Sequence, residues 1–248
     1  MKLEKLFLVS VLLVSAIGVD YGNAEEQNVY QIDNDGWTVW VNCSLRSPTT
    51  FHYLTQPDGG NFPRRSDYLH DPRLPQDCQA EITDTFQSVI DDDAIHYDVG
   101  HLVPANHMDH SGLSIFQTNY WSNLAPQSAS MNRGAWLLTE EIIECYRDIA
   151  DLEVWGGVIW AGKFPTSYFN ESHKVLIPTA FWKVIVRLDD KESLAWIIPN
   201  DFAPRSSLDQ WIQSVSAVEA VTGLIFDVDD RDSRPLRSWA LPTKCDKS

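Results

Sequence analysis

The sequence predicts a single α+β domain, and three observations support this prediction. Its 248 residues are 44% hydrophobic and 22% charged, and they include 10 Trp and 10 Phe, which is enough to build a sizeable core. Alternating apolar and polar stretches typical of strands are interspersed with stretches of helical period. No repeat, low-complexity tract or linker divides the chain after its first residues.

The N-terminal segment, residues 1–24, has the pattern of a secretory signal. Lys2 and Lys5 precede an apolar run, and small residues at positions 22 and 24 precede Glu25. The apolar run is about 14 residues long, shorter than the roughly 20 that span a bilayer. We therefore expect a secreted or periplasmic protein with no stable membrane association, whose mature domain covers residues 25–248.

The elements of the domain can be assigned in order along the chain. Apolar alternation and β-branched residues predict strands over residues 36–42, 50–55, 153–160, 180–188 and 194–198. Spacing and length predict helices over residues 80–90, 131–149, 207–215 and 217–223. Residues 56–79 are rich in Pro, Gly, Asp and Arg and predict a long irregular loop, and residues 97–127 are mixed and turn-rich.

The four cysteines indicate disulfide bonds. They are even in number, widely spaced and free of any CxxC pair, in a chain expected to be exported. Three pairings are possible. We favour Cys43–Cys78 with Cys145–Cys245, because the second bond would attach the C-terminal tail to the body, but the sequence alone leaves the choice open.

The charge balance limits how the protein can bind polyanions. With 19 Lys+Arg and 35 Asp+Glu, its formal net charge is −16. This excludes a protein that coats nucleic acid or anionic membrane by bulk charge. It leaves room for a local basic site.

The polar residues that can carry chemistry are concentrated in three segments, residues 98–108, 118–127 and 131–140. They supply a His after a Gly (His101), amides before a Pro, and an Asn at a predicted helix start (Asn132). Glu140 lies eight residues after Asn132, just over two helical turns, so both can face the same side.

These segments resemble the DNA/RNA non-specific endonuclease family. The family's Asp-Arg-Gly-His is matched by residues 98–101, its Asn-x-x-x-Asn element by residues 119–127, and its Asn-x-Gly-x-Trp helix start by residues 132–136. Weaker matches are found at residues 65–72, 177–183 and 217–226. The likeness extends over roughly residues 35–228 in the same order, and the combined spacing is much more specific than any single motif.

The resemblance implies a fold, an activity and a metal. The family fold has a central antiparallel sheet flanked by helices and a ββα-metal finger active site. The implied enzyme is a secreted endonuclease that depends on Mg²⁺, with Mn²⁺ as a possible substitute. It would hydrolyse phosphodiester bonds of DNA and RNA with little sequence specificity, because phosphate contacts carry no base information.

The resemblance also implies roles for individual residues. His101 is the expected general base, because a neutral imidazole can take a proton from water near neutral pH. Asn132 offers a hard amide oxygen to Mg²⁺, and Glu140 is expected to hold a metal-bound water. Asn123 is expected to fix the His-bearing strand or the attacking water. The expected substrate-binding residues are Arg65, Arg133 and Asn119.

Two positions depart from the family pattern. Val99 replaces the Arg of the Asp-Arg-Gly-His motif, and Glu144 stands where the family has a second basic residue on the long helix. Arg133, together with Arg64 or Arg65, can supply replacement charge. The departures keep two alternatives open, a catalytically impaired nuclease-like binding protein and a phosphodiesterase for a smaller substrate. The sequence does not indicate the preferred polymer or the oligomeric state.

Overall fold

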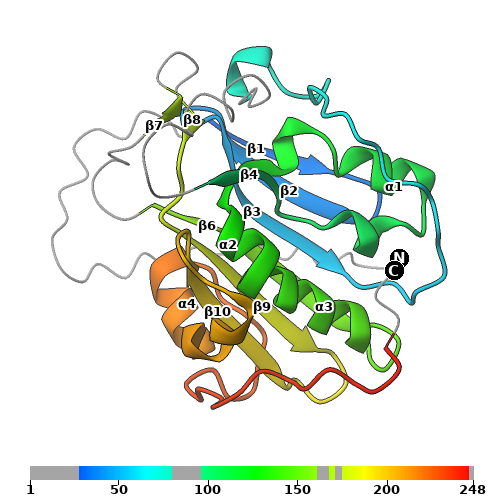
Figure 1. Cartoon of the computed structure of the whole chain (residues 1–248), viewed down its shortest axis with the longest axis vertical. Coiled ribbons are helices and arrows are strands. Elements are labelled where there is room, and N and C mark those ends of the chain that lie inside the picture. Colours follow the sequence, from blue (N-terminus) through cyan, green and yellow to red (C-terminus); the bar gives the residue numbers. More distant parts are fainter. Residues whose placement is uncertain (1–27, 80–95, 161–167, 171–174, 246–248) are drawn as a thin grey trace, which may run out of the picture.

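A seven-stranded antiparallel sheet forms the centre of the protein (Figure 1). The computed structural model describes residues 28–79, 96–160, 168–170 and 175–245. The strand order of the sheet is β1-β2-β3-β6-β9-β10-β11, and every neighbouring pair is antiparallel. The strands are β1 Val29–Asp33, β2 Trp37–Asn42, β3 Ser47–Leu54, β6 Leu152–Ile159, β9 Ala180–Arg187, β10 Ser193–Pro199 and β11 Ile212–Gln213. The predicted α+β class is confirmed.

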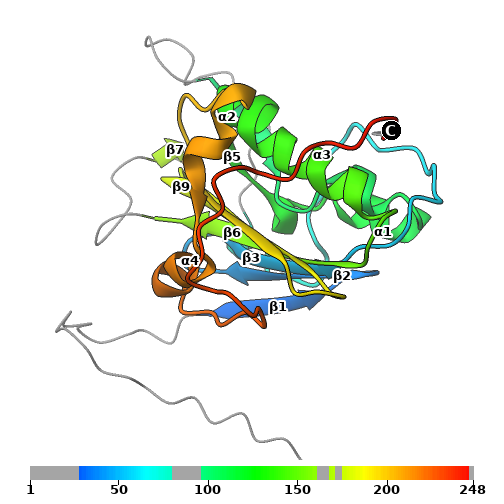
Figure 2. The ribbon, with the colours of Figure 1, turned by 90° about the horizontal axis from the view of Figure 1, so that it is seen from below.

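Helices pack on both faces of this sheet (Figure 2). Alternation along β9 shows why: Phe181 and Ile185 join the main core with Trp136 of the long helix, whereas Trp182 and Val184 join a second core with Val218. Helix α3, Leu137–Tyr146, covers the first face, and helix α4, Val215–Thr222, covers the second. The central strands are thus buried on both sides.

A small hairpin attached to the long helix builds the ββα unit. Strand β4, Tyr97–His101, pairs with β5, Leu124–Ser128, and helix α2, Ala129–Met131, starts directly after β5. Between the two strands lie α1, Gly112–Gln117, and 3₁₀ turns at Ala105–Met108 and Trp121–Asn123. A further short hairpin pairs β7, Tyr168–Asn170, with β8, Val175–Leu176.

The helix predicted over residues 131–149 is interrupted in the structure. A π-helical turn at Asn132–Trp136 separates α2 from α3, and Gly134 inside it has the non-helical angles φ −112° and ψ −106°. The carbonyl of Ala203 accepts the N–H of Ala135 at 3.0 Å. A Cβ at Gly134 would lie 2.6 Å from that same carbonyl oxygen, so the close approach requires glycine. This tertiary contact, which helical periodicity does not reveal, causes the interruption.

Other element predictions had mixed outcomes. The predicted strands are confirmed with shifts of a few residues at their ends, whereas β1, β11 and the strands of the two small hairpins were missed. The helix predicted over residues 207–215 is wrong, because a 3₁₀ segment, Arg205–Trp211, leads into β11 at the edge of the sheet. The helix predicted over residues 217–223 is confirmed as α4, which starts two residues earlier and is capped by Gly223 with φ 73°. The signal at residues 1–24 and the helix at 80–90 lie outside the described residues.

Both favoured disulfides are confirmed. Cys43 bonds to Cys78, which ties the irregular loop of residues 56–79 to strand β2's end, and Cys145 of α3 bonds to Cys245 of the tail. No helix in the described part of the chain is long and apolar enough to cross a membrane.

Candidate active site

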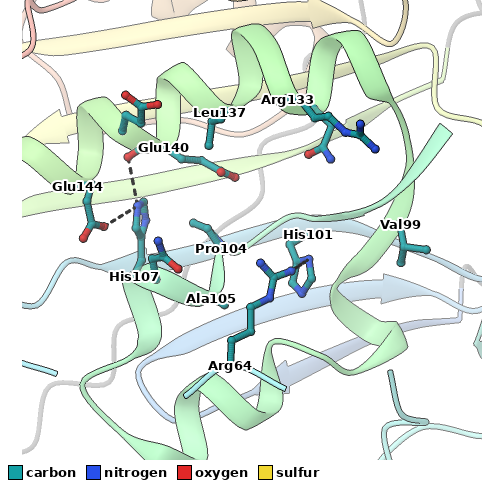
Figure 3. Close-up of a pocket in the computed structure, with 13 residues that line it drawn as sticks. Arg64, Val99, His101, Pro104, Ala105, His107, Arg133, Leu137, Glu140 and Glu144 are labelled. Atoms are coloured by element: carbon teal, nitrogen blue, oxygen red, sulfur yellow. Dashed lines mark hydrogen bonds and ion pairs between the residues drawn. The ribbon is translucent and has the colours of Figure 1, made fainter. Parts of the chain in front are cut away.

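A cavity of about 310 Å³ opens between the β4 hairpin and helix α3 (Figure 3). His101, the last residue of β4, lies on one side, and Asn132 and Glu140 line it from the π turn and α3. Its other lining residues are Arg64, Val99, Pro104, Ala105, Asn106, His107, Arg133, Leu137, Glu141 and Glu144. The structure therefore brings together the three residues for which the sequence predicted the central chemistry.

The imidazole of His101 is held by Asn119. Its Nε2 lies 3.1 Å from Asn119 Oδ1, while Asn119 Nδ2 donates to the carbonyls of Arg65 at 3.1 Å and Asp67 at 3.0 Å. These two bonds fix the amide so that its oxygen faces His101. Because an amide oxygen can only accept, Nε2 of His101 carries the hydrogen. In the neutral ring, Nδ1 is then the free base.

Burial keeps His101 neutral. The residue is only 8% exposed, and burial followed by the nearby Arg64 guanidinium lowers its pKa from 6.5 to about 4. Arg64 Nη2 lies 3.4 Å from Nδ1 and can only donate. His101 is therefore unprotonated throughout the neutral range and available to accept a proton at Nδ1.

Asn132 is oriented by an acidic neighbour on β4. Its Nδ2 donates to Asp98 Oδ2 at 2.9 Å, which leaves the amide oxygen as the ligand atom. Among the described residues, no group of three or more His, Cys, Asp or Glu side chains is arranged to hold a metal ion. A single amide oxygen beside a carboxylate, in a cavity with room for water, nevertheless fits Mg²⁺, which binds few protein ligands and retains several waters.

Glu140 is a carboxylate in a poorly solvated position. Burial raises its pKa above the ordinary 4.5, while Lys183 and Arg64 oppose this rise. Its backbone carbonyl lies 3.2 Å from His107 Nε2. A carboxylate on the same cavity wall as Asn132 is suited to accept hydrogen bonds from metal-bound water.

Glu144 places a buried carboxyl group at the far end of the cavity. The sequence indicated only that a cation of the family pattern is missing at this position. Glu144 is 4% exposed and lies 2.5 Å from Arg147 and 3.2 Å from His107. Arg147 also pairs with Asp58 at 2.8 Å, and His107 Nδ1 contacts the Tyr53 hydroxyl at 2.6 Å. Burial raises the pKa of Glu144 to about 8. This buried cluster replaces a phosphate-binding cation with a carboxyl group.

The three predicted cation candidates occupy different places. Arg64 lines the cavity next to His101. Arg65 is not among the cavity residues; it pairs with Asp67 at 2.6 Å and stacks on Phe116 at 4.8 Å. Arg133 lines the cavity with its side chain 73% exposed, but it forms a two-point ion pair with Asp98 at 2.6 and 2.9 Å. Arg64 is thus the cation placed nearest the base.

Asn123 and Val99 do not present reactive atoms to the cavity. Asn123 is fully buried, and its amide bonds the backbone of Val103 in both directions and the carbonyl of Thr118, each at 2.9 Å. This arrangement fixes the chain just after the His-bearing strand, one of the two roles expected for it. Val99 packs against the small apolar cluster that contains Trp121 and Leu124.

Comparison with known proteins shows a common family. The sequence model of the family described as DNA/RNA non-specific endonuclease matches residues 16–233. Nuclease C1 of Cunninghamella echinulata var. echinulata is 27% identical over 73% of this chain and 73% of its own length. The nuclease of Serratia marcescens is 29% identical over 85% of this chain and 79% of its own length.

Solved structures share the fold. The chain is similar to a crystal structure of the EndoG/EndoGI complex, which concerns the mechanism of EndoG inhibition. The TM-score is 0.67 and the sequence identity is 21%. The match covers 79% of this chain and 84% of that one. At this identity the likeness describes the fold: a large antiparallel sheet with few helices.

Proposed function

Because this chain belongs to the DNA/RNA non-specific endonuclease family, we propose that it is a nuclease that hydrolyses phosphodiester bonds within DNA and RNA. The observation that carries the proposal is the cavity in which His101, Asn132 and Glu140 meet beside Arg64. These groups address a phosphate and a water molecule and offer nothing complementary to a particular base. Cleavage is therefore expected to be largely independent of sequence.

His101 is the proposed general base. Its Nδ1 takes a proton from the water that attacks phosphorus, and Nε2–H remains bonded to Asn119 Oδ1. That bond strengthens as the ring becomes charged, because the acceptor carries a partial negative charge. Arg64, which contacts Nδ1 in the free protein, is then available to bind a phosphate oxygen.

Asn132 is the proposed protein ligand for Mg²⁺, with Mn²⁺ as a substitute, and Glu140 accepts hydrogen bonds from the water around it. When bound there, the ion would neutralise charge on the scissile phosphate and the leaving oxygen. Asp98 fixes the Asn132 amide through Nδ2 and keeps its oxygen directed at the site. Asn123 holds the backbone of residues 102–104 that closes the cavity.

The proposal includes export. Two disulfides and the signal-like residues 1–24 are both typical of a secreted or periplasmic protein with a mature domain over residues 25–248. DNA and RNA are the proposed substrates, and no stable membrane association is expected. The acidic surface limits non-specific adsorption, so binding depends on the local charges at the cavity.

A smaller phosphodiester is a second candidate substrate. Val99 removes one cation and Glu144 places a carboxyl group at the far end of the cavity. A polymer crossing the whole cavity would find a carboxyl group in place of a phosphate-binding cation at that end, whereas a single diester held by Arg64 would not reach it. A third possibility, a nuclease-like protein that binds without cleaving, follows from the same two changes.

One experiment separates these candidates. The mature protein is incubated with plasmid, single-stranded DNA, RNA and bis(p-nitrophenyl) phosphate, each with Mg²⁺ or EDTA. An endonuclease cuts the three polymers in Mg²⁺, and His101→Ala abolishes cutting while circular dichroism is unchanged. Cleavage of the small diester alone supports the second candidate. Polymer binding without any cleavage supports the third and would refute the proposed activity.

A further inference from the structure

Lys183 is a cation enclosed in the core beneath the active-site helix. It lies on β9, on the face that packs against α3, and its side chain is fully buried. Its Nζ donates to Thr139 Oγ1 at 2.8 Å and lies 3.7 Å from the centre of the Trp136 ring. Within the described residues it makes no direct ion pair.

A buried ammonium with one hydrogen bond needs a compensating charge nearby. Isolated charges in a protein interior are strongly disfavoured, and a cation over an aromatic face recovers only part of the lost hydration. Thr139 directly precedes Glu140, and Trp136 lies one turn before it, so Lys183 sits under the turn of α3 that carries the Glu140 carboxylate. The negative charge of Glu140 opposes the effect of burial on Lys183, and among the charges that favour ionisation of Glu140 that of Lys183 acts most strongly.

The other groups that act on Glu140 do not replace this charge. Arg64 approaches from the loop on the opposite side of the cavity, and it is the cation proposed to move onto phosphate. The neighbouring Glu141 opposes ionisation of Glu140, and its own carboxylate pairs with Arg205 at 2.5 Å. His107 contacts the Glu140 backbone and is held neutral by burial, which lowers its pKa.

We propose that Lys183 is a positioning residue for the nuclease site, a buried counter-charge that favours the ionised form of Glu140 and keeps it directed at the water of the metal site. Lys183 is not among the residues that line the cavity, so it acts through Glu140 alone. The role of Glu140 in this proposal rests on the proposed function, whereas the electrostatic link between Lys183 and Glu140 does not. Lys183 remains in place when Arg64 engages phosphate, so it supplies a charge that substrate binding does not remove.

The charge of Lys183 distinguishes this role from simple packing. If Lys183 served only to fill the core, an apolar residue of the same shape would do so at lower cost, since replacing buried charges by well-packed apolar groups is often neutral or stabilising. Lys183→Met keeps the stem and removes the charge. Thr139→Val is the matched control, because it removes the hydrogen bond to Nζ and leaves the charge in place.

The test follows the Glu140 carboxyl directly in the metal-free protein. The pH midpoint of its ¹³C signal, assigned with Glu140→Gln, is measured in the wild type, Lys183→Met and Thr139→Val, together with Tm and the Mn²⁺ dissociation constant at neutral pH. We expect Lys183→Met to raise the midpoint by about one pH unit or more. It should weaken Mn²⁺ binding by about 10-fold, with Tm unchanged or higher. Thr139→Val should change the midpoint much less.

An unchanged midpoint in Lys183→Met would overturn the proposal, as would an equal shift in Thr139→Val. Should Lys183→Met fail to fold, Lys183→Gln retains a donor for Thr139 and is judged by the same midpoint. Because the titration needs neither metal nor substrate, its outcome is separate from the proposed activity. A shifted midpoint in a protein that cleaves no polymer would refute the nuclease proposal and keep the Lys183–Glu140 link.

Discussion

The Nε2 atom of His101 lies 3.1 Å from Oδ1 of Asn119, and this bond determines which side of the imidazole faces the cavity. Asn119 can serve only as an acceptor there, because its own amide hydrogens are used by the carbonyls of Arg65 and Asp67. The loop of residues 56–79 thus sets the tautomer of a histidine on the β4 strand. Asn119, expected from the sequence to bind substrate, contacts the proposed base.

Replacing Asn119 with Leu should therefore lower kcat far more than it raises KM. Without its acceptor, His101 can adopt the wrong tautomer or turn, and we expect a loss of about 10²-fold, within the range attributed to a positioned base. Steady-state rates on plasmid and on a short oligonucleotide provide the measurement. Asn119→Asp keeps an acceptor and should retain more of kcat. Equal losses in both variants, carried by KM, would instead indicate that Asn119 binds substrate.

The pH dependence of cleavage should follow Glu140 and not His101. Burial lowers the pKa of His101 to about 4, so the base stays neutral as the pH falls through the range where free histidine titrates. Burial raises the pKa of Glu140, and its ionised form is the one proposed to order the metal-bound water. Activity is therefore lost as the pH falls through the raised pKa of Glu140.

The measurement is kcat/KM across the acidic and neutral range at saturating Mg²⁺. In Glu140→Gln the residual activity should keep its value to lower pH, and its acid limb should move toward about 4, where His101 titrates. An acid limb near the ordinary histidine pKa of about 6.5, present in both proteins, would show that His101 is better solvated than its burial indicates.

Glu144→Gln should stabilise the protein at alkaline pH. The pKa of Glu144 is about 8 in the folded state and 4.5 ordinarily, so the folded protein holds this proton more tightly than the unfolded chain. The stability that results is fully present below about 4.5 and is lost as the pH rises to about 8. Arg147 already has Asp58 at 2.8 Å, so it keeps a partner in the variant. We expect a gain of about 2–4 °C in Tm at high pH, equivalent to roughly 1 kcal/mol.

The contrast with low pH is the check on this prediction. Near pH 5 the wild-type carboxyl group is protonated, so Gln and Glu should give nearly the same Tm. Asp58→Asn is the matched variant, since it removes a more exposed acid from the same Arg147 cluster. A loss of Tm at high pH in Glu144→Gln would mean that the ion pair with Arg147 contributes more than burial costs.

The sequence predicted which residues share the cavity better than it predicted their ion pairs. Spacing alone placed Asn132 and Glu140 on one side of a helix, and they share a cavity even though a π turn follows Asn132, because Gly134 only bends the segment locally. Local sequence could not show that Asp98 neutralises Arg133 or that Arg65 pairs with Asp67. Ion pairs depend on where side chains end in space, and neighbouring residues such as Arg64 and Arg65 point to different partners.

Fold predictions failed where long-range contacts outweighed local preference. Residues 207–215 have helical spacing, but Ile212 pairs with Trp196 of β10 and extends the sheet by one strand. Lys183 was matched only as part of a strand motif, because nothing in its strand indicates a helix carboxylate above it. The buried cluster around Arg147 likewise gathers residues from positions 53 to 147, which no sequence spacing connects.

Val99→Arg tests whether the enzyme lacks a cation or has relocated one. Val99 lines the cavity, and the nearby Arg133 is occupied by Asp98, so Arg64 is the cation left beside His101. If charge is limiting, the added guanidinium should increase the initial rate on plasmid several-fold. It should also steepen the log–log salt dependence by about 0.9 for one new phosphate contact.

Val99→Met, similar in length but uncharged, controls for the altered packing against Trp121. The double variant with Arg64→Ala completes the cycle, since independent sites give additive effects. A rate that falls equally in Val99→Arg and Val99→Met would show that the apolar contact matters more than the charge. A gain that appears only when Arg64 is absent would show that Arg64 already fills the phosphate position.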